Sequence, residues 1–383
     1  MFAIVAENEN LIPMIKIKVV FTILLIHLTL SFNVEAMDIP QSYTTSIEGM
    51  AEYAKANSGT IREGLLIIQK WMSENMVYDM EKYKQITSLS NKALKSGALQ
   101  KSTALETLTK RKGVCEDFAL LFAVIAREIG VEMFVVTGSS SRGGAHAWCA
   151  SVIDNEPYLF DPTWASGSVN EDTGEYFKKL NMDYFMVSPD KIHHIPVDPL
   201  WQFSEHPLKY NQTESDNSVA EKESPYFNWR DTFETYIKMD TLHKAESSFR
   251  RGIRNGTPNA DIASDLACFA MYIANIRFSN IRVELNNVIN QIDSGSGRWG
   301  NDSKAKTAIQ NVENQIVECE NNMNSVKAVD DFYQKEINVY LKYIADLKRE
   351  VSRCKTKLEK QKKEDDKRSS KRQSEMQLFN FSE

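Results

Sequence analysis

A cysteine, a histidine and an aspartate stand in this sequence where a nucleophile, a base and an orienting carboxylate could meet. Cys115 follows Gly113 and Val114 and opens an apolar run whose spacing predicts a buried helix as far as Ile129. The N-terminus of a helix favours the thiolate form of a cysteine, which is its nucleophilic form. A single cysteine beside a buried helix is more often an ordinary core residue, so Cys115 alone predicts no activity.

His146 and Asp161 supply the groups that a cysteine nucleophile needs. His146 begins a predicted strand, and its neutral imidazole could accept the thiol proton. If Asp154 and Asn155 form a two-residue hairpin turn, His146 lies opposite Thr163, and Asp161 projects from the same face of the sheet as a diagonal neighbour. A carboxylate there holds the imidazole in the required tautomer. The three side chains meet only if the helix N-terminus packs against this hairpin.

The elements that must position these residues predict an α+β domain. Helices come first and short strands follow, which is the order of an antiparallel sheet covered by a helical layer. A polar stretch at 80–103 leads from the first helices to the central one, and the loop Gly138–Gly144 separates the first two strands. The expected helices are Tyr43–Ala56, Ile61–Tyr78 and Cys115–Ile129, and the expected strands are Glu132–Thr137, Ala145–Ile153 and Tyr158–Asp161.

Three segments resemble the transglutaminase-like superfamily, which has a papain-like core. They are GVCEDFALLFAVIAREIG, GGAHAWCASVI and YLFDPTWASG, with a Gly-x-Cys helix start, a His-Ala-Trp strand and an Asp-Pro-Thr-Trp strand. The resemblance covers about residues 45–210, and its flanking segments look most similar to kyphoscoliosis peptidase-like proteins. Those flanks are Trp71–Asp79, Tyr184–Pro189 and Pro199–Gln202.

The resemblance implies a Cys-His-Asp triad in which Cys115 is the nucleophile, His146 the general base and acid, and Asp161 the orienting carboxylate. The family transfers an acyl group from an amide through a thioester. Water completes the reaction in a peptidase or deamidase, and an amine completes it in a transglutaminase. We expect hydrolysis rather than cross-linking, because water is abundant outside the cell. The triad itself is common to these outcomes.

Other residues near the triad have less specific interpretations. The backbone N–H of Cys115 is an expected oxyanion donor because it lies at a helix start, and no second donor is identifiable. Trp148 and Trp164 are either core residues or walls of an acyl groove, while Glu116 and Asp117 suit helix capping. The sequence has no Asp-rich calcium loop and no ligand spacing for zinc, with His193-His194 only a weak metal signal. We therefore expect no cofactor and no metal.

The N-terminal region has the pattern of a secretory signal peptide. Lys16 and Lys18 precede the apolar run Val19–Phe32, and Val34 and Ala36 would frame cleavage after residue 36. The apolar run is shorter than the ~20 residues of a membrane-spanning helix, so an uncleaved anchor is the less favoured alternative. Met14 is an alternative start, and the expected location is secreted or periplasmic. In such a compartment the five cysteines leave at least one thiol unpaired.

Beyond the expected catalytic domain, 37–210, the strand signals disappear. Residues 211–224 are polar and predict a linker, and 225–360 predicts helices at roughly 229–252, 258–291 and 303–360. The last pattern carries a heptad seam that predicts a coiled coil at about 330–358, and the charged segment 361–383 predicts a frayed, disordered tail. The seam residues are Ile337, Tyr340, Ile344, Leu347, Val351, Cys354 and Leu358.

The heptad seam allows two interpretations. In a parallel coiled coil of two chains it would place the two Cys354 residues face to face, where they could form a disulfide. In an intramolecular bundle it would instead cover the apolar faces of 229–252 and 258–291.

Composition narrows the possible functions. The chain has 383 residues, 42% of them hydrophobic, and a net charge of −6, which argues against a nucleic-acid partner. The favoured function is an exported cysteine-dependent enzyme acting on protein or peptide amides. The alternative is a non-catalytic binding or scaffold protein that assembles, with itself or a partner, through its C-terminal helices.

Overall fold

The structure is a computed structural model, and its described residues exclude the predicted signal peptide at 1–36 and the predicted linker at 211–224. Those two predictions therefore lie outside the described residues. No helix among the described residues is long and apolar enough to cross a membrane. The described ranges are 38–88, 102–170, 173–210, 225–256, 258–293, 302–327 and 329–380.

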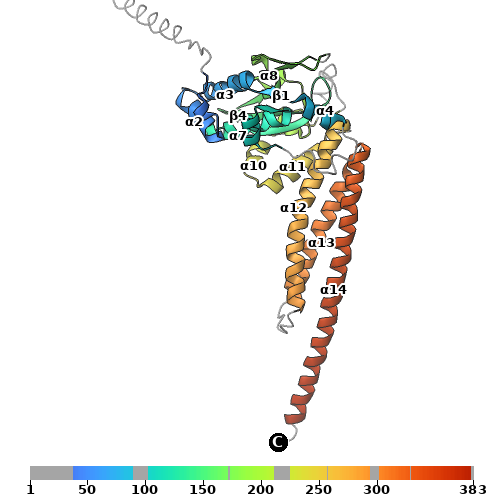
Figure 1. The fold of residues 1–383 in the computed structure, drawn as a ribbon. Coiled ribbons are helices and arrows are strands. Elements are labelled where there is room, and N and C mark those ends of the chain that lie inside the picture. Colours follow the sequence, from blue (N-terminus) through green and yellow to red (C-terminus); the bar gives the residue numbers. More distant parts are fainter. Residues whose placement is uncertain are drawn as a thin grey trace, which may run out of the picture.

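The N-terminal half is an α+β domain in which helices cover a small antiparallel sheet, as the sequence predicted (Figure 1). Its four-stranded sheet has the order β5-β4-β3-β8. The helices are α2 (Ile47–Ala56), α3 (Ile61–Asn75), α4 (Met80–Ser88), α6 (Ala104–Lys110), α7 (Cys115–Ile129) and α8 (Pro162–Ser166), with 3-10 turns η1 (Gln41–Tyr43), η2 (Met182–Tyr184), η3 (Pro189–Lys191) and η4 (Pro199–Gln202). The strands are β1 (Val77–Tyr78), β2 (Lys112–Gly113), β3 (Phe134–Ser139), β4 (Ala145–Ile153), β5 (Glu156–Phe160), β6 (Gly167–Val169), β7 (Tyr176–Lys178) and β8 (Ile195–Pro196).

Helix α7 is the centre of this domain and has the predicted bounds. Phe118 and Phe122 are fully buried in a core shared with α2, α3 and β4. The N-terminus is capped by Asp117, whose Oδ2 accepts the Val114 N–H at 2.8 Å, and the helix ends at Gly130 in the left-handed region. The sequence predicted capping for Glu116 and Asp117, and Asp117 is the residue that caps the helix.

The predicted hairpin turn is present, and it sets the register of the sheet. Asp154 and Asn155 both have positive φ values, 52° and 65°, as a two-residue turn requires. Ile153 pairs with Glu156, and the ladder continues to Cys149 opposite Phe160. The ladder stops there, because the chain from Pro162 onward turns into helix α8. Thr163 is thus not opposite His146, and the expected Asp-Pro-Thr-Trp strand is wrong.

The last strand approaches β3 so closely that only glycine fits at position 138. Gly138 pairs with Pro196 on β8, and a Cβ there would lie 2.1 Å from the Ile195 carbonyl oxygen. We expect Gly138→Ala to lower the free energy of unfolding by about 3 kcal/mol, because backbone must move to relieve the overlap. Urea denaturation measures this change. Gly143→Ala is the control, since its φ is +84° but nothing lies within 4 Å, and an equal loss would contradict the prediction.

The C-terminal half is helical and extends away from the sheet (Figure 1). Two of the predicted helices are interrupted: Asp240 caps a new helix within 229–252, and the segment 326–330 divides 303–360. The helices are α10 (Trp229–Ile237), α11 (Thr241–Arg254), α12 (Ala260–Asp293), α13 (Asp302–Ser325) and α14 (Asp331–Asn380).

The heptad seam of α14 packs inside the chain. Ile344, Leu347 and Cys354 are buried in one apolar cluster with residues of α12 and α13. The structure thus has the intramolecular bundle rather than the parallel coiled coil between two chains. Cys354 is buried in this bundle.

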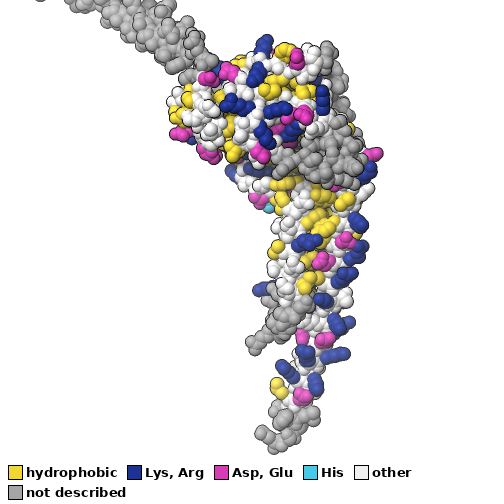
Figure 2. All heavy atoms as spheres, viewed as in Figure 1, with side chains coloured by type: hydrophobic (Ala, Val, Ile, Leu, Met, Phe, Trp, Pro, Cys, Tyr) yellow, Lys and Arg dark blue, Asp and Glu magenta, His cyan; other side chains and the backbone are white. Residues whose placement is uncertain are grey.

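Helix α14 continues past the bundle, where a frayed tail was expected. Residues 361–380 are helical, and Figure 2 shows basic and acidic side chains along this projecting end. Mixed charges spaced by one turn support such a helix, as between Lys371 and Glu375 at 3.9 Å.

Candidate active site

Asp161 is the fully buried residue that joins the strand β5 to helix α8. It is the N-cap of α8, and its Oδ1 accepts the N–H groups of Thr163 at 3.1 Å and Trp164 at 3.0 Å. Pro162, at the first helical position, has no N–H to offer a sheet and favours the helix start. Gln69 on α3 secures α8 by donating to Ser166 Oγ at 2.9 Å. Capping thus fixes one carboxylate oxygen and directs the other toward the sheet.

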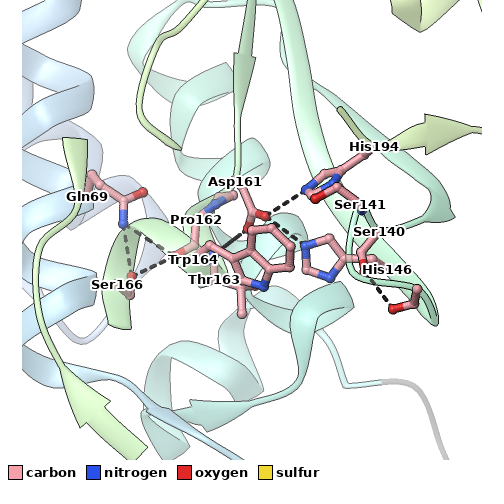
Figure 3. Close-up of polar contacts among 11 residues, drawn as sticks. Gln69, Ser140, Ser141, His146, Asp161, Pro162, Thr163, Trp164, Ser166 and His194 are labelled. Carbon is pink, nitrogen blue, oxygen red and sulfur yellow. Dashed lines mark hydrogen bonds and ion pairs between the residues drawn. The ribbon is translucent and has the colours of Figure 1, made fainter. Parts of the chain in front are cut away.

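His146 on β4 meets that second oxygen. Its Nε2 lies 2.8 Å from Asp161 Oδ2, and the two side chains are 7% and 0% exposed (Figure 3). Because Nε2 faces the carboxylate, Nδ1 is the nitrogen that remains for a thiol. Burial by itself lowers the pKa of His146, but the charge and hydrogen bond of Asp161 outweigh it and raise this pKa to about 10.

Cys115 is half-buried at the first position of α7. It lies near enough to His146 to be a further cause of the raised histidine pKa. The structure therefore brings the three predicted residues into one cluster, although strand pairing does not place Asp161 there. Their catalytic roles stay a prediction.

A second histidine, which the sequence analysis did not connect with the site, contacts the same carboxylate. His194 Nε2 lies 3.1 Å from Asp161 Oδ2, and the backbone N–H of Ser141 donates to His194 Nδ1 at 3.1 Å (Figure 3). Since Nδ1 accepts a hydrogen bond, the proton of the neutral ring is on Nε2, which donates to Asp161. Burial lowers the pKa of His194, which agrees with a neutral ring.

A cleft of about 620 Å³ opens beside His146. One wall is the loop between β3 and β4, including Arg142, and another is Trp164 with the β6–β7 hairpin. Trp164 stacks on the His146 ring with centroids 5.2 Å apart. Of the two predicted roles, core residue or groove wall, Trp164 therefore has the position of a wall. Trp148 is instead a buried core residue. The imidazole of His146 forms part of the cleft wall.

Comparison with known proteins identifies this half of the chain. Residues 50–189 match the family model of a transglutaminase-like domain. This part of the chain is similar to the transglutaminase-like family. This match includes Cys115, His146 and Asp161.

Two curated relatives carry the same similarity. Kyphoscoliosis peptidase of Mus musculus is 26% identical over 208 residues, which are 50% of this chain and 30% of that protein. Kyphoscoliosis peptidase of Homo sapiens is 26% identical over 197 residues, 47% of this chain and 28% of that protein. The chain thus spans less than a third of the length of these relatives. A solved TGase structure is 17% identical over 34% of this chain and 35% of its own, with a TM-score of 0.25, too low to establish a shared overall fold.

Tyr78 is another residue of the transglutaminase-like domain that sequence analysis misplaced. It was expected at the end of a helix, but α3 ends at Asn75 and Tyr78 lies on β1, which pairs with β2 just before Cys115. Burial, followed by the charge of the nearby Cys115, raises the pKa of Tyr78 far above its usual range. Tyr78 therefore keeps a protonated hydroxyl beside the thiol.

The same domain has one group of side chains, among the described residues, that could hold a metal ion. The ligand atoms of His146, Asp161 and His194 lie within 4.8 Å of one another. Both histidines hydrogen-bond Asp161 Oδ2, and two backbone N–H groups occupy Oδ1, so hydrogen bonds account for this geometry without a metal.

The raised pKa of His146 predicts a pH-dependent stability for the domain. A group whose pKa is raised on folding stabilises the fold fully below its unfolded value, here 6.5, and loses this contribution as the pH rises through about 10. We expect the free energy of unfolding of the wild type to exceed that of His146→Gln most at pH 6. The difference should shrink toward pH 10 by at most about 1.4 kcal/mol per pH unit. Urea titrations of both proteins measure it, and a constant difference would contradict the assignment.

Proposed function

We propose that this chain is an exported cysteine enzyme that attacks protein or peptide amides through a thioester, with Cys115, His146 and Asp161 as its triad. The observation that carries the proposal is the buried His146–Asp161 hydrogen bond of 2.8 Å, which faces a thiol at a helix N-terminus. The transglutaminase-like match supports the reaction class, and the N-terminal sequence pattern supports export to the periplasm or the medium.

The proposed reaction uses the two nitrogens of His146 differently: Nε2 faces Asp161, and Nδ1 is left for the thiol of Cys115. With the thiol proton held on Nδ1 of His146, as its raised pKa favours, the thiolate attacks the amide carbon, which forms a C–S bond and an oxyanion. His146 then gives the proton to the leaving nitrogen as the C–N bond breaks, and a thioester remains. Water, deprotonated by His146, attacks the thioester, and the C–S bond breaks to release the acid and the thiol. An amine in place of water would give transfer, but we favour hydrolysis.

Tyr78 supplies the second oxyanion donor that the sequence left unidentified. The first is the backbone N–H of Cys115, at the start of α7. Because the Tyr78 hydroxyl is near Cys115 and stays protonated, it can donate to the developing oxyanion.

We expect Tyr78→Phe to lower kcat for amide hydrolysis by about 100-fold, the usual effect of losing one such donor. The alkylation rate of Cys115 by iodoacetamide should change little, because alkylation forms no oxyanion. Parallel rate measurements on the wild type and the variant separate the two effects. Equal losses in both reactions would show that Tyr78 acts on the thiol itself.

The test of the proposed function is the reactivity of one thiol among five. We expect iodoacetamide to label Cys115 faster than Cys149, Cys268, Cys319 or Cys354 in the folded protein, and His146→Ala to remove this advantage. A peptide library incubated with and without a primary amine, read by mass spectrometry, then distinguishes hydrolysis from transfer. Cys115→Ser is the control for contaminating activity. If Cys115 is labelled no faster than the others, and no product depends on it, the non-catalytic scaffold is the better interpretation.

A further inference from the structure

We propose that His194 is a positioning residue, which holds the Asp161 carboxylate in line with His146 and ties it to the loop that borders the cleft. The proposal rests on the proposed function, since it assigns His194 a part in that same reaction. Three contacts of His194 support it.

The first contact is with the carboxylate. Asp161 Oδ1 is held by two backbone donors, whereas Oδ2 faces two histidine rings, His146 at 2.8 Å and His194 at 3.1 Å. His194 adds a second donor to Oδ2, so the oxygen that faces His146 is held from two sides.

The second contact is with the loop between β3 and β4. Ser141 donates its backbone N–H to His194 Nδ1, and Ser140 Oγ donates to the Gly143 carbonyl at 2.7 Å within the loop. Both Ser140 and Gly143 line the cleft. His194 thus fixes the cleft wall and the carboxylate with the two nitrogens of one ring.

The third set of contacts fixes the ring of His194 itself. The imidazole packs edge-on against Trp148 and Trp164, with centroid distances of 4.9 and 4.8 Å, and its side chain is 1% exposed. Its main chain is placed by the adjacent strand β8, which pairs with β3. A ring held on all sides can act as a fixed support, as positioning requires.

Two conservative variants separate the two hydrogen bonds. In His194→Gln the amide nitrogen can occupy the place of Nε2 and keep the donor to Asp161. In His194→Asn the amide oxygen can occupy the place of Nδ1 and keep only the acceptor for Ser141. His194→Ala removes both.

The readout is the second-order rate constant for alkylation of Cys115 by iodoacetamide, measured at a temperature where every variant is folded. We expect the rate constant of His194→Gln to stay within about 3-fold of the wild type, and those of His194→Asn and His194→Ala to fall by about 10- to 100-fold. With a peptide substrate, the loss should be in kcat rather than KM. A purely structural role would lower the melting temperature of all three variants without this ranking. If His194→Asn were alkylated as fast as the wild type, the proposal would be overturned. If Cys115 of the wild type were no more reactive than the other cysteines, the proposed function would be overturned instead.

We also infer, from a separate observation, that the cleft selects peptides with acidic residues next to the reacting amide. Among the described residues that line it, the charged ones besides His146 are Arg142 and Lys179, both cations on different walls. The Arg142 guanidinium lies over the Trp164 ring at 4.7 Å, and neither cation has an ion-pair partner in the described parts of the chain. Two cations without a counter-charge among the described residues suit the carboxylate groups of an acidic peptide, and they disfavour a basic peptide.

The test uses the Cys115→Ala variant, which can bind a peptide without turning it over. Two fluorescein-labelled decapeptides share a central glutamine and differ only in flanking Glu or Lys residues, and fluorescence anisotropy measures their affinities. We expect the acidic peptide to bind at least about 10-fold more tightly at low salt, and the preference to fall below about 3-fold in 0.5 M NaCl. Additional Arg142→Gln and Lys179→Gln changes should also remove it, whereas Lys335→Gln, on the exposed face of α14, should not. Equal affinities, or no binding of either peptide, would overturn the inference without bearing on the alkylation test of the triad.

Discussion

Asp161→Asn is expected to slow acyl transfer at Cys115 by about 10³- to 10⁴-fold and to destabilise the domain. The reason is the number of donors around the side chain. Four donors face its two oxygens: the backbone N–H groups of Thr163 and Trp164, and the Nε2 groups of His146 and His194. An asparagine has only one oxygen, so its NH₂ group must face two donors in either orientation.

Both orientations damage the site, though in different ways. With NH₂ toward the histidines, His146 loses the acceptor that selects its tautomer, which costs about 10⁴ in kcat in a comparable triad. With NH₂ toward the cap, α8 loses its N-cap and two buried donors lack acceptors, at about 1–3 kcal/mol each. A conservative exchange therefore affects rate and stability together.

Alkylation kinetics, peptide turnover and urea denaturation of Asp161→Asn measure these effects. Asp183→Asn is the matched control, because it makes the same exchange at an exposed carboxylate in the same domain and should change neither quantity noticeably. A variant of Asp161 with wild-type rate and stability would mean that the carboxylate neither orients His146 nor caps α8.

Local patterns predicted the parts of this site that lie on regular elements. The apolar periodicity after Cys115 gave helix α7 with its observed bounds, since a buried helix shows its spacing over four turns. The pair Asp154-Asn155 gave the hairpin and thereby the register of β4 and β5. The partnership of His146 with Asp161 followed from family resemblance more than from the strand geometry.

The errors arose where a short-range signal competed with the strand pattern. Asp161-Pro162 is also a helix start, because aspartate caps and proline suits the first helical turn, and this signal prevailed over strand pairing. The contacts of Tyr78 and His194 could not be predicted, because Tyr78 reaches Cys115 through pairing across 34 residues and His194 lies 33 residues beyond Asp161. The only sequence feature that draws attention to His194 is the adjacent His193, and this pair indicates a metal site only weakly.

The heptad seam shows a different limit. Its spacing correctly identified the buried face of α14, but an apolar face does not specify whether its partner belongs to the same chain. The long apolar stretch of α12 decides the outcome, because α12 offers α14 a surface that needs no second molecule.

The second large effect concerns the ion pair that joins the helical half to the segment carrying His194. Arg251 on α11 donates from Nε and Nη2 to the two oxygens of Asp198, at 2.7 and 2.6 Å, just beyond β8. The side chains of Arg251 and Asp198 are 15% and 3% exposed. We expect Arg251→Met to lower the free energy of unfolding by about 3–5 kcal/mol, because it leaves a buried carboxylate without its counter-charge.

The reciprocal change should cost less. In the wild type the Leu200 N–H donates to Asp198 at 3.0 Å, and the amide oxygen of Asp198→Asn can still accept this bond. Arg251 meanwhile keeps its bond to Ser247 Oγ and its contact with the Tyr236 ring. We expect a loss of about 1–3 kcal/mol for this variant. The double variant should be more stable than Arg251→Met alone, because it no longer buries an unpaired charge.

Urea denaturation of the two single variants and the double variant forms the cycle that measures this asymmetry. Arg349→Met is the control, since Arg349 pairs with Asp346 on the exposed surface of α14, where screening by water makes such a pair weak. If Arg251→Met cost no more than this control, the pair could not fix the segment after β8. The position of His194 would then depend on the strand pairing of β8 and on its contacts with Trp148 and Trp164 alone.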